Sequence, residues 1–157
     1  MKKLIVMMIL LASSQVFARA DIRCNNADCL VYGWNYRDYA KAADGSVMCI
    51  ENSCLRYGWT VYDRFGTADV RCTNLDCFGS GWTEAYNGRF VRNVSCLQND
   101  CLRNGWRTSS GTDNLVTYCR NSNCSAYGWT TYIPGRGNVD AICHNQACFV
   151  NGWEVVP

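Results

Sequence analysis

The residue types on which most enzymes depend are scarce in this chain of 157 residues. His144 is its one histidine, and the chain contains no Gly-x-Ser-x-Gly, His-Glu-x-x-His or phosphate-binding glycine motif. All 12 cysteines have a partner at a fixed spacing, so no odd thiol is left as a nucleophile. The sequence therefore predicts a protein that is not an enzyme, with no catalytic residue, cofactor or metal. A hydrolase whose two carboxylates meet only in space stays open as an alternative.

Basic residues do not outnumber acidic residues once the N-terminal segment 1–18 is removed. A short basic start, the apolar run 4–11 and the small residues that end at Ala18 are typical of a secretory signal peptide at residues 1–18. Cleavage is expected after Ala18 or, alternatively, after Ala20. Loss of the two lysines in that segment lowers the 15 basic residues to 13, which equals the 13 acidic residues. Phosphate backbones need a basic surface, so we expect no nucleic-acid partner. We also expect no transmembrane segment after cleavage, and a secreted or periplasmic location of bacterial type.

What the chain has in abundance is one phrase, repeated six times: Cys, four residues, Cys, three residues, Gly-Trp. Successive tryptophans lie 23 to 25 residues apart, a period that indicates a repeat architecture. Every cysteine and every tryptophan belongs to a copy of the phrase. The copies contain Cys24, Cys29 and Trp34; Cys49, Cys54 and Trp59; Cys72, Cys77 and Trp82; Cys96, Cys101 and Trp106; Cys119, Cys124 and Trp129; and Cys143, Cys148 and Trp153.

The cysteines of an exported chain, even in number and regular in spacing, predict six disulfides. Pairing inside each phrase, such as Cys24 with Cys29, is the preferred arrangement. Disulfides between each second cysteine and the first cysteine of the next unit are also compatible with the repeat, and they remain an alternative. Zinc sites are the other alternative, but four residues between two cysteines lies at the edge of the usual spacing.

The residues around the phrase predict two short strands and one helical turn in each unit. Segments such as Val70-Arg71-Cys72 alternate in the way of a half-buried strand. Asp, Ser or Asn precedes the second cysteine in five copies, and glycine follows five places later. This pattern predicts a capped single turn that ends in a left-handed glycine, although a tight β-hairpin is an alternative. Asn87-Gly88 predicts a two-residue hairpin turn.

These features predict an all-β, disulfide-rich fold of six tandem β-hairpin repeats of about 24 residues, with one helical turn each, in a single domain at residues 19–157. The last unit lacks a hairpin after Trp153, whereas residues 21–23 supply a lone strand before the first unit. Pairing of these two ends would close the units into a propeller- or barrel-like ring. A closed ring leaves no sheet edge exposed, so we favour it over an open β-solenoid.

The position before each Gly-Trp varies between the units, as expected where ligands are bound. The candidate ligand-binding residues are the tyrosines and asparagines at this position: Tyr32, Tyr57, Asn104, Tyr127 and Asn151. Solvent exposure alone would explain the same residues equally well. The tryptophans do not vary, which favours a role in the core of the repeat; stacking on sugar rings is the alternative.

Gly-Trp followed by a β-hairpin with aromatic residues resembles, in form, the cell-wall-binding repeats of bacterial surface proteins. Those repeats lack the paired cysteines, so the likeness transfers no residue and assigns no family. We expect a non-catalytic module that binds cell-envelope or other glycans. The alternative is a protein-binding scaffold, an inhibitor or a structural component of the envelope, with its contacts in the variable segments 35–46 and 132–138.

Overall fold

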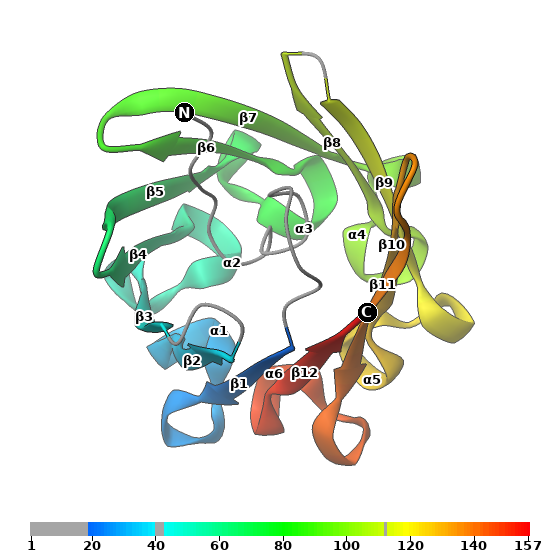
Figure 1. The fold of residues 1–157 in the computed structure, drawn as a ribbon. Helices are drawn as coiled ribbons and strands as arrows, with labels where there is room; N and C mark the ends of the chain where they lie inside the picture. The colour runs from blue at the N-terminus through cyan, green and yellow to red at the C-terminus, as the bar shows by residue number, and fades with distance from the viewer. Residues whose placement is uncertain (1–18, 40–42, 112) are drawn as a thin grey trace.

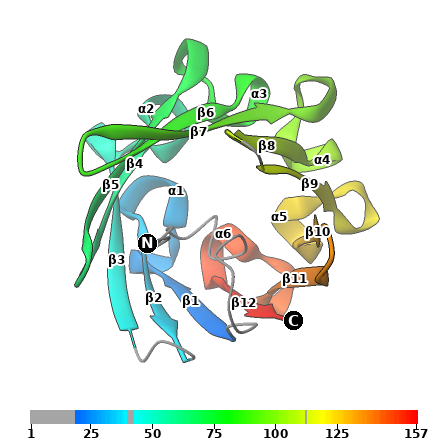
Figure 2. The ribbon, with the colours of Figure 1, turned by 45° about the horizontal axis from the view of Figure 1, so that its top comes forward.

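The computed structural model describes residues 19–39, 43–111 and 113–157. These residues form a closed antiparallel barrel of twelve strands, which runs once around its axis from β1 to β12 (Figures 1 and 2). The predicted six-hairpin ring is therefore confirmed, and the open solenoid is wrong. The strands are β1 (Ala20–Cys24), β2 (Trp34–Asp38), β3 (Ala43–Cys49), β4 (Trp59–Asp63), β5 (Gly66–Cys72), β6 (Trp82–Tyr86), β7 (Arg89–Cys96), β8 (Trp106–Ser110), β9 (Asp113–Cys119), β10 (Trp129–Ile133), β11 (Gly137–Cys143) and β12 (Trp153–Val156).

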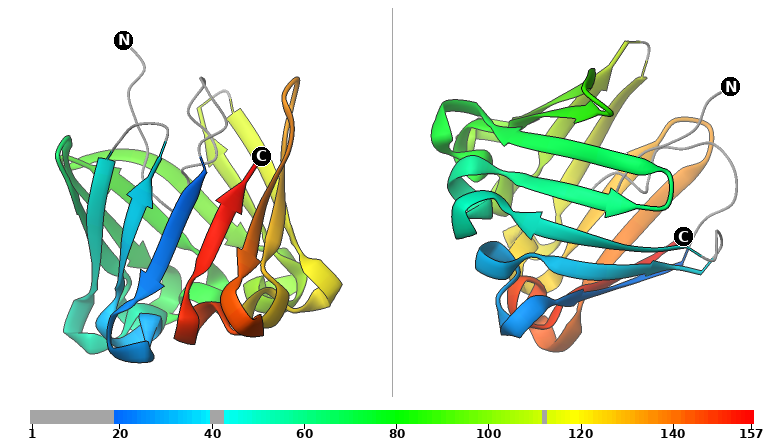
Figure 3. Two further views of the ribbon diagram at one scale, coloured as in Figure 1. Left: turned by 60° about the horizontal axis from the view of Figure 1, so that its bottom comes forward. Right: turned by 90° about the vertical axis from the view of Figure 1, so that its left-hand side faces the viewer.

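The two ends of the barrel differ. Six short helical connections lie at one end, and the hairpin turns lie at the other (Figure 3). Each helical connection holds a 3-10 turn and then an α-helical turn. The 3-10 turns are Asn25–Ala27, Ile50–Asn52, Thr73–Leu75, Leu97–Asn99, Arg120–Ser122 and His144–Gln146. The α-helical turns are α1 (Cys29–Tyr32), α2 (Cys54–Tyr57), α3 (Cys77–Ser80), α4 (Cys101–Asn104), α5 (Cys124–Tyr127) and α6 (Cys148–Asn151).

Strand alternation separates the inner face of the barrel from its outer face. In β4, Trp59 and Val61 are buried inside, whereas Tyr62 on the outer face is exposed. Each tryptophan has a strand partner on both sides, as Trp59 shows. On one side it pairs with Cys49, the first cysteine of its own phrase. On the other side it pairs with Val70, which lies two residues before the first cysteine of the next phrase. The residues two places before the first cysteine are buried in all six units, as the alternation predicts: Ile22, Val47, Val70, Val94, Thr117 and Ala141.

The six tryptophans form a complete ring at the helical end of the barrel. Neighbouring indole rings lie 5.4 to 6.0 Å apart between centroids, tilted by 54° to 60°, and the contact of Trp34 with Trp153 completes the circle. Such tilted contacts suit the quadrupoles of aromatic rings. Phe78 and Phe149, from opposite units, meet at 5.7 Å, and each also contacts the tryptophan of its own unit. The barrel core is therefore anchored at one end by aromatic packing.

Each disulfide joins the two cysteines of one phrase, so pairing inside the unit is confirmed. The six bonds are Cys24–Cys29, Cys49–Cys54, Cys72–Cys77, Cys96–Cys101, Cys119–Cys124 and Cys143–Cys148. The sulfur of each first cysteine also lies 3.1 to 3.5 Å from the carbonyl oxygen of the second cysteine in the preceding unit. Oxidised sulfur carries no proton, so these are S···O contacts between neighbouring units and not hydrogen bonds.

Four of the five expected caps bind the start of their helical turn. The side chains of Asp28, Asp76, Asp100 and Asn123 accept hydrogen bonds from backbone N–H groups of the turn that follows. Ser53 has the same backbone conformation but makes no such bond through its side chain. The capped turn is therefore the correct local structure, and the tight β-hairpin is not.

The glycine before each tryptophan ends its helical turn, but in a different conformation from the expected one. The six glycines have φ of 78° to 93° and ψ of −155° to −169°, a region almost restricted to glycine. A Cβ atom at any of them would lie 1.9 to 2.0 Å from a carbonyl oxygen in the adjacent unit. The glycine is therefore needed for close packing between units as well as for the turn.

The predicted hairpin turn at Asn87-Gly88 is confirmed. Both residues have positive φ, 47° and 76°, as a two-residue type I′ turn requires. The flanking residues Tyr86 and Arg89 pair across the two strands. The register shifts between Glu84 and Ala85, so β6 and β7 contain a bulge close to this turn.

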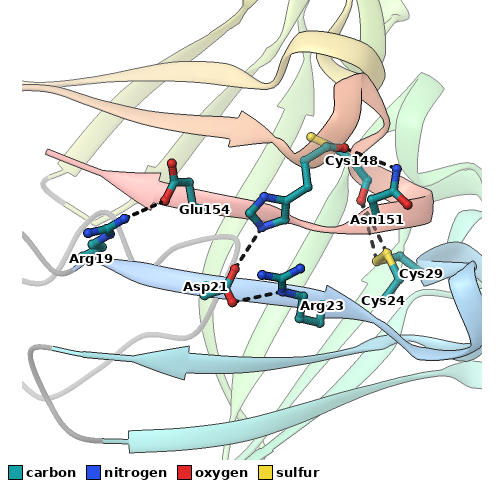
Figure 4. A network of polar contacts seen from close by, with 9 residues as sticks. Arg19, Asp21, Arg23, Cys24, Cys29, Cys148, Asn151 and Glu154 are labelled. Carbon is teal, nitrogen blue, oxygen red and sulfur yellow. Dashed lines mark hydrogen bonds and ion pairs between the residues drawn. A yellow bond between two sulfur atoms is a disulfide. The ribbon is translucent and has the colours of Figure 1, made fainter.

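A short seam closes the ring between the first and last strands. β1 and β12 pair at three positions, and polar side-chain contacts lie around this pairing (Figure 4). Nη2 of Arg19 lies 3.2 Å from Oε2 of Glu154, and Nε2 of His144 lies 2.9 Å from Oδ1 of Asp21. Arg23 contacts the same Asp21 at 3.0 Å. Exposed ion pairs contribute at most about 1 kcal/mol each, so the strand pairing is the main source of closure.

Candidate functional site

The predicted ligand-binding residues do not come together in one place. Tyr32, Tyr57, Asn104, Tyr127 and Asn151 each end the helical turn of a different unit, so they are spread around the helical end of the ring. Arg56 lies over the ring of Tyr57 at 5.4 Å, and Nδ2 of Asn151 donates to the carbonyl of His144 at 3.4 Å. That these residues bind a ligand stays a prediction.

The tryptophans are not available to a ligand as stacking surfaces. Their exposed fractions are 0 to 4%, and each indole contacts the indoles of both neighbouring units. A sugar ring could reach them only if the core opened. Any binding surface must therefore be built from residues that differ between the units.

A groove of about 560 Å3 lies on the outer face of strands β1 to β4. We call it the β1–β4 groove. One row of paired residues crosses it: Arg23 on β1, Asn35 on β2, Ser46 on β3 and Tyr62 on β4. The two small residues at the centre of this row lie between the longer Arg23 and Tyr62, which explains why the surface is hollowed there.

On the inner face of the sheet behind this row, Gly45 makes room for a buried tyrosine. Its strand partner is Tyr36, and a Cβ atom at Gly45 would lie 2.2 Å from atoms of that tyrosine ring. The Tyr36 hydroxyl donates to Oδ2 of Asp63 at 3.3 Å, and burial together with this carboxylate raises the pKa of the tyrosine well above its usual range. Tyr36 is therefore a neutral, buried side chain on the inner face, behind the strands that form the groove.

The charges that line the groove compensate one another. Arg23 lies 3.0 Å from Asp21, and Arg37 lies 3.5 Å from Asp44. The guanidinium of Arg37 also lies 5.9 Å from the ring centroid of Tyr39, an exposed side chain at the end of the groove. The groove thus presents two tyrosines, two planar guanidinium groups and small polar side chains, with no net charge.

No protein-family model, curated protein or solved structure matches this chain.

Tyr62 belongs to a second sequence pattern, which extends beyond the repeated Cys-to-Trp phrase. Tyr-Gly-Trp-Thr-x-Tyr occurs in two of the six units, at residues 57–62 and 127–132. In both, the threonine hydroxyl donates to an aspartate on the next strand: Thr60 to Asp69 at 2.8 Å and Thr130 to Asp140 at 2.5 Å. Comparison of the residues three places after each tryptophan would have found this signal in the sequence alone.

The inner face of the barrel carries ionisable groups that do not line the groove. Asp38 on β2, Glu84 on β6 and Arg92 on β7 are each at most 6% exposed. The Trp82 indole N–H donates to Oε1 of Glu84 at 2.9 Å. Burial raises the pKa of Glu84 to about 7, although this hydrogen bond and the charge of Arg92 act in the opposite direction.

The raised pKa of Glu84 predicts a loss of stability with increasing pH. Because the folded-state pKa lies above the ordinary value of 4.5 for a glutamate, protonated Glu84 favours the fold. This contribution is complete below pH 4.5 and is lost as the pH rises through 7, by about 3 kcal/mol in total. Glu84→Gln keeps the acceptor for Trp82 and should remove this pH dependence.

The measurement is the denaturant midpoint of both proteins at pH 5 and pH 8. We expect the variant to lose less stability than the wild type between these values. Equal pH dependence of the two proteins would show that the Glu84 carboxyl has an ordinary pKa. Glu154→Gln, on the exposed side of β12, is the matched control and should behave as the wild type.

Two further properties limit the chemistry of the described chain. In residues 19–39, 43–111 and 113–157, no three His, Cys, Asp or Glu side chains are grouped so that they could hold a metal ion. None of the helices in these segments is long and apolar enough to cross a membrane.

Proposed function

We propose that this protein is a secreted or periplasmic, non-catalytic module that binds cell-envelope or other glycans in the β1–β4 groove. The observation that supports the proposal is a groove that combines two exposed tyrosines, Tyr62 beside a hollow of small polar residues and Tyr39 at the end of the groove, with charges that compensate one another. Binding sites of this kind are concave and orient their ligand through a few polar groups.

The chemistry of the groove suits a neutral, polyhydroxylated ligand. A tyrosine ring offers an apolar face for the C–H face of a sugar, and its hydroxyl offers a hydrogen bond at the edge. Guanidinium groups donate in a fixed planar fork, and Asn35 and Ser46 both donate and accept. Because each arginine already has an aspartate partner, a strongly anionic ligand would have to displace it.

Six disulfides are consistent with an oxidising or extracellular compartment, where such bonds persist. The predicted signal peptide at residues 1–18 lies outside the described residues, so export remains part of the proposal. A glycan of the cell envelope is the ligand that such a location would supply.

We expect Tyr62→Ser to weaken retention on purified bacterial peptidoglycan by at least about tenfold, the effect of removing one aromatic anchor. Tyr62 is 44% exposed, so the substitution should leave the fold intact. Tyr62→Phe keeps the stacking ring and should retain most of the binding. Phe90→Ser on β7 is the matched control, because that aromatic side chain is 68% exposed and lies outside the groove.

The same proteins are tested on a glycan array, which asks whether another polysaccharide is preferred. Retention of the oxidised wild type on neither peptidoglycan nor any arrayed glycan would contradict the proposal. A protein that co-purifies with the wild type and is lost on substitution of segments 35–46 or 132–138 would support the scaffold alternative instead.

A further inference from the structure

Two opposite units of the barrel share a surface arrangement that the other four lack. Tyr62 and Tyr132 both stand three residues after the tryptophan of their unit, on the outer face of their strand. The other four units carry Arg37, Ala85, Ser109 and Val156 at this position, and their strands pair in the same closed barrel. The fold therefore does not require a tyrosine there.

The environment of Tyr132 provides what a second sugar-binding surface needs. Tyr132 is 55% exposed, and Tyr118 on the neighbouring strand is 58% exposed. Thr130, which lies two residues before Tyr132, pairs directly with Tyr118 across the strands. The two tyrosines are therefore diagonal neighbours on one face, about 7–8 Å apart at the backbone.

Polar groups are held beside this aromatic pair. Thr130 is paired with Asp140 on β11 and donates its hydroxyl proton to that carboxylate, which fixes the orientation of the acid. A carboxylate oriented in this way accepts hydrogen bonds from neighbouring hydroxyl groups of a sugar. Thr60 and Asp69 repeat the same bond beside Tyr62. The paired aspartate therefore accompanies the exposed tyrosine in both units.

From these observations we infer that the outer face of β9 to β11 is a second glycan-binding site, centred on Tyr118, Tyr132 and Asp140. The inference rests on the proposed function of the β1–β4 groove and gives the protein a second site for the same class of ligand. The second site is flatter than the groove, because Val116 takes the place of Ser46 next to its tyrosine.

Tyr62 and Tyr132, one from each site, face in opposite directions. β4 and β10 are six positions apart in a closed ring of twelve strands, and they lie on opposite sides of the barrel (Figure 1). Both sites therefore cannot contact one flat surface at the same time, and avidity on a single surface is excluded by geometry. The protein should instead bridge two separate glycan chains or particles.

The test compares cross-linking with simple retention, using suspended peptidoglycan fragments as the probe. We expect the wild type to agglutinate the fragments, measured as turbidity and by microscopy. Tyr132→Ser and Asp140→Asn should raise the concentration needed for agglutination by at least about tenfold, while retention in a pull-down falls no more than about twofold. Tyr132→Phe should agglutinate as the wild type does.

The reciprocal variants complete the design. Tyr62→Ser should not agglutinate and should keep only the weaker retention of the second site, at least about tenfold below that of the wild type. The double variant Tyr62→Ser with Tyr132→Ser should not bind. Near-UV circular dichroism, which reports the tryptophan ring, confirms that each variant is folded.

Failure of the inference can be told apart from failure of the proposed function. If the wild type is retained on peptidoglycan, and agglutination by Tyr132→Ser and Asp140→Asn equals that of the wild type, the second site is wrong while the first stands. This result would also follow if cross-linking came from self-association of a chain with one site. Absence of retention by the wild type would remove both proposals.

Discussion

Full reduction of the six disulfides is expected to unfold the barrel in the absence of denaturant. Each bond closes a loop of a few residues, and the chain-entropy estimate for such a loop is about 2 kcal/mol. The six bonds together contribute about 12 kcal/mol, which is comparable to the whole stability of a typical domain, roughly 5–15 kcal/mol. Each unit, with two short strands and two helical turns, is too small to hold a core by itself.

The measurement is near-UV circular dichroism and tryptophan fluorescence during reduction, with free thiols titrated in parallel. Loss of the tryptophan signal should accompany the appearance of the thiols. Replacement of one pair, Cys96→Ala with Cys101→Ala, should cost only about 2 kcal/mol and leave the barrel folded. A protein with twelve free thiols and an unchanged near-UV spectrum would show that aromatic packing alone maintains the fold.

Gly105→Ala is expected to destabilise the barrel strongly, although it adds only one methyl group. Gly105 has φ of +92° and ψ of −159°, a region that costs other residues about 1–3 kcal/mol. The new Cβ atom would lie 2.0 Å from the carbonyl oxygen of Thr117 and 2.8 Å from its carbon, and neither is the end of a flexible side chain. We expect a total loss of at least about 3 kcal/mol, because strain and overpacking act together.

Gly135→Ala is the matched control for this prediction. Gly135 also has positive φ, +75°, but an added Cβ atom would meet nothing within 4 Å. Its substitution should therefore cost only about 1 kcal/mol of backbone strain. Denaturant unfolding of both variants separates the two causes. Equal losses would mean that conformation, and not close packing between units, explains the glycine of the repeated phrase.

The local part of the fold was predictable because its signals lie within one unit. Alternation before the first cysteine, the cap before the second and the glycine after it are separated by a few residues, and together they predict strand, turn and strand. The prediction of a left-handed glycine was inaccurate for a tertiary reason. The glycine conformation is set by the neighbouring unit, whose carbonyl oxygen occupies the space that a Cβ atom would need.

The candidate site was harder to predict, because equal positions in successive units are one sixth of a turn apart. Tyr32, Tyr57 and Tyr127 occupy the same position in their units. Because the units follow one another around the ring, these tyrosines are spread around it. The β1–β4 groove forms from unequal positions instead. Arg23 and Tyr62 line one groove because the strand register brings β1 to β4 together, and no alignment of the copies shows that row.

The repeat, the preferred pairing of the cysteines, and the two strands and helical turn of each unit can all be derived from the amino-acid sequence. These properties follow from interactions over a few residues, which the order of side chains specifies directly. Only the tertiary structure decided that the ring closes, because closure depends on the small rotation between units accumulated over all six. That accumulated rotation brings His144 to Asp21, 123 residues away, and places Tyr62 and Tyr132 on opposite sides of the barrel.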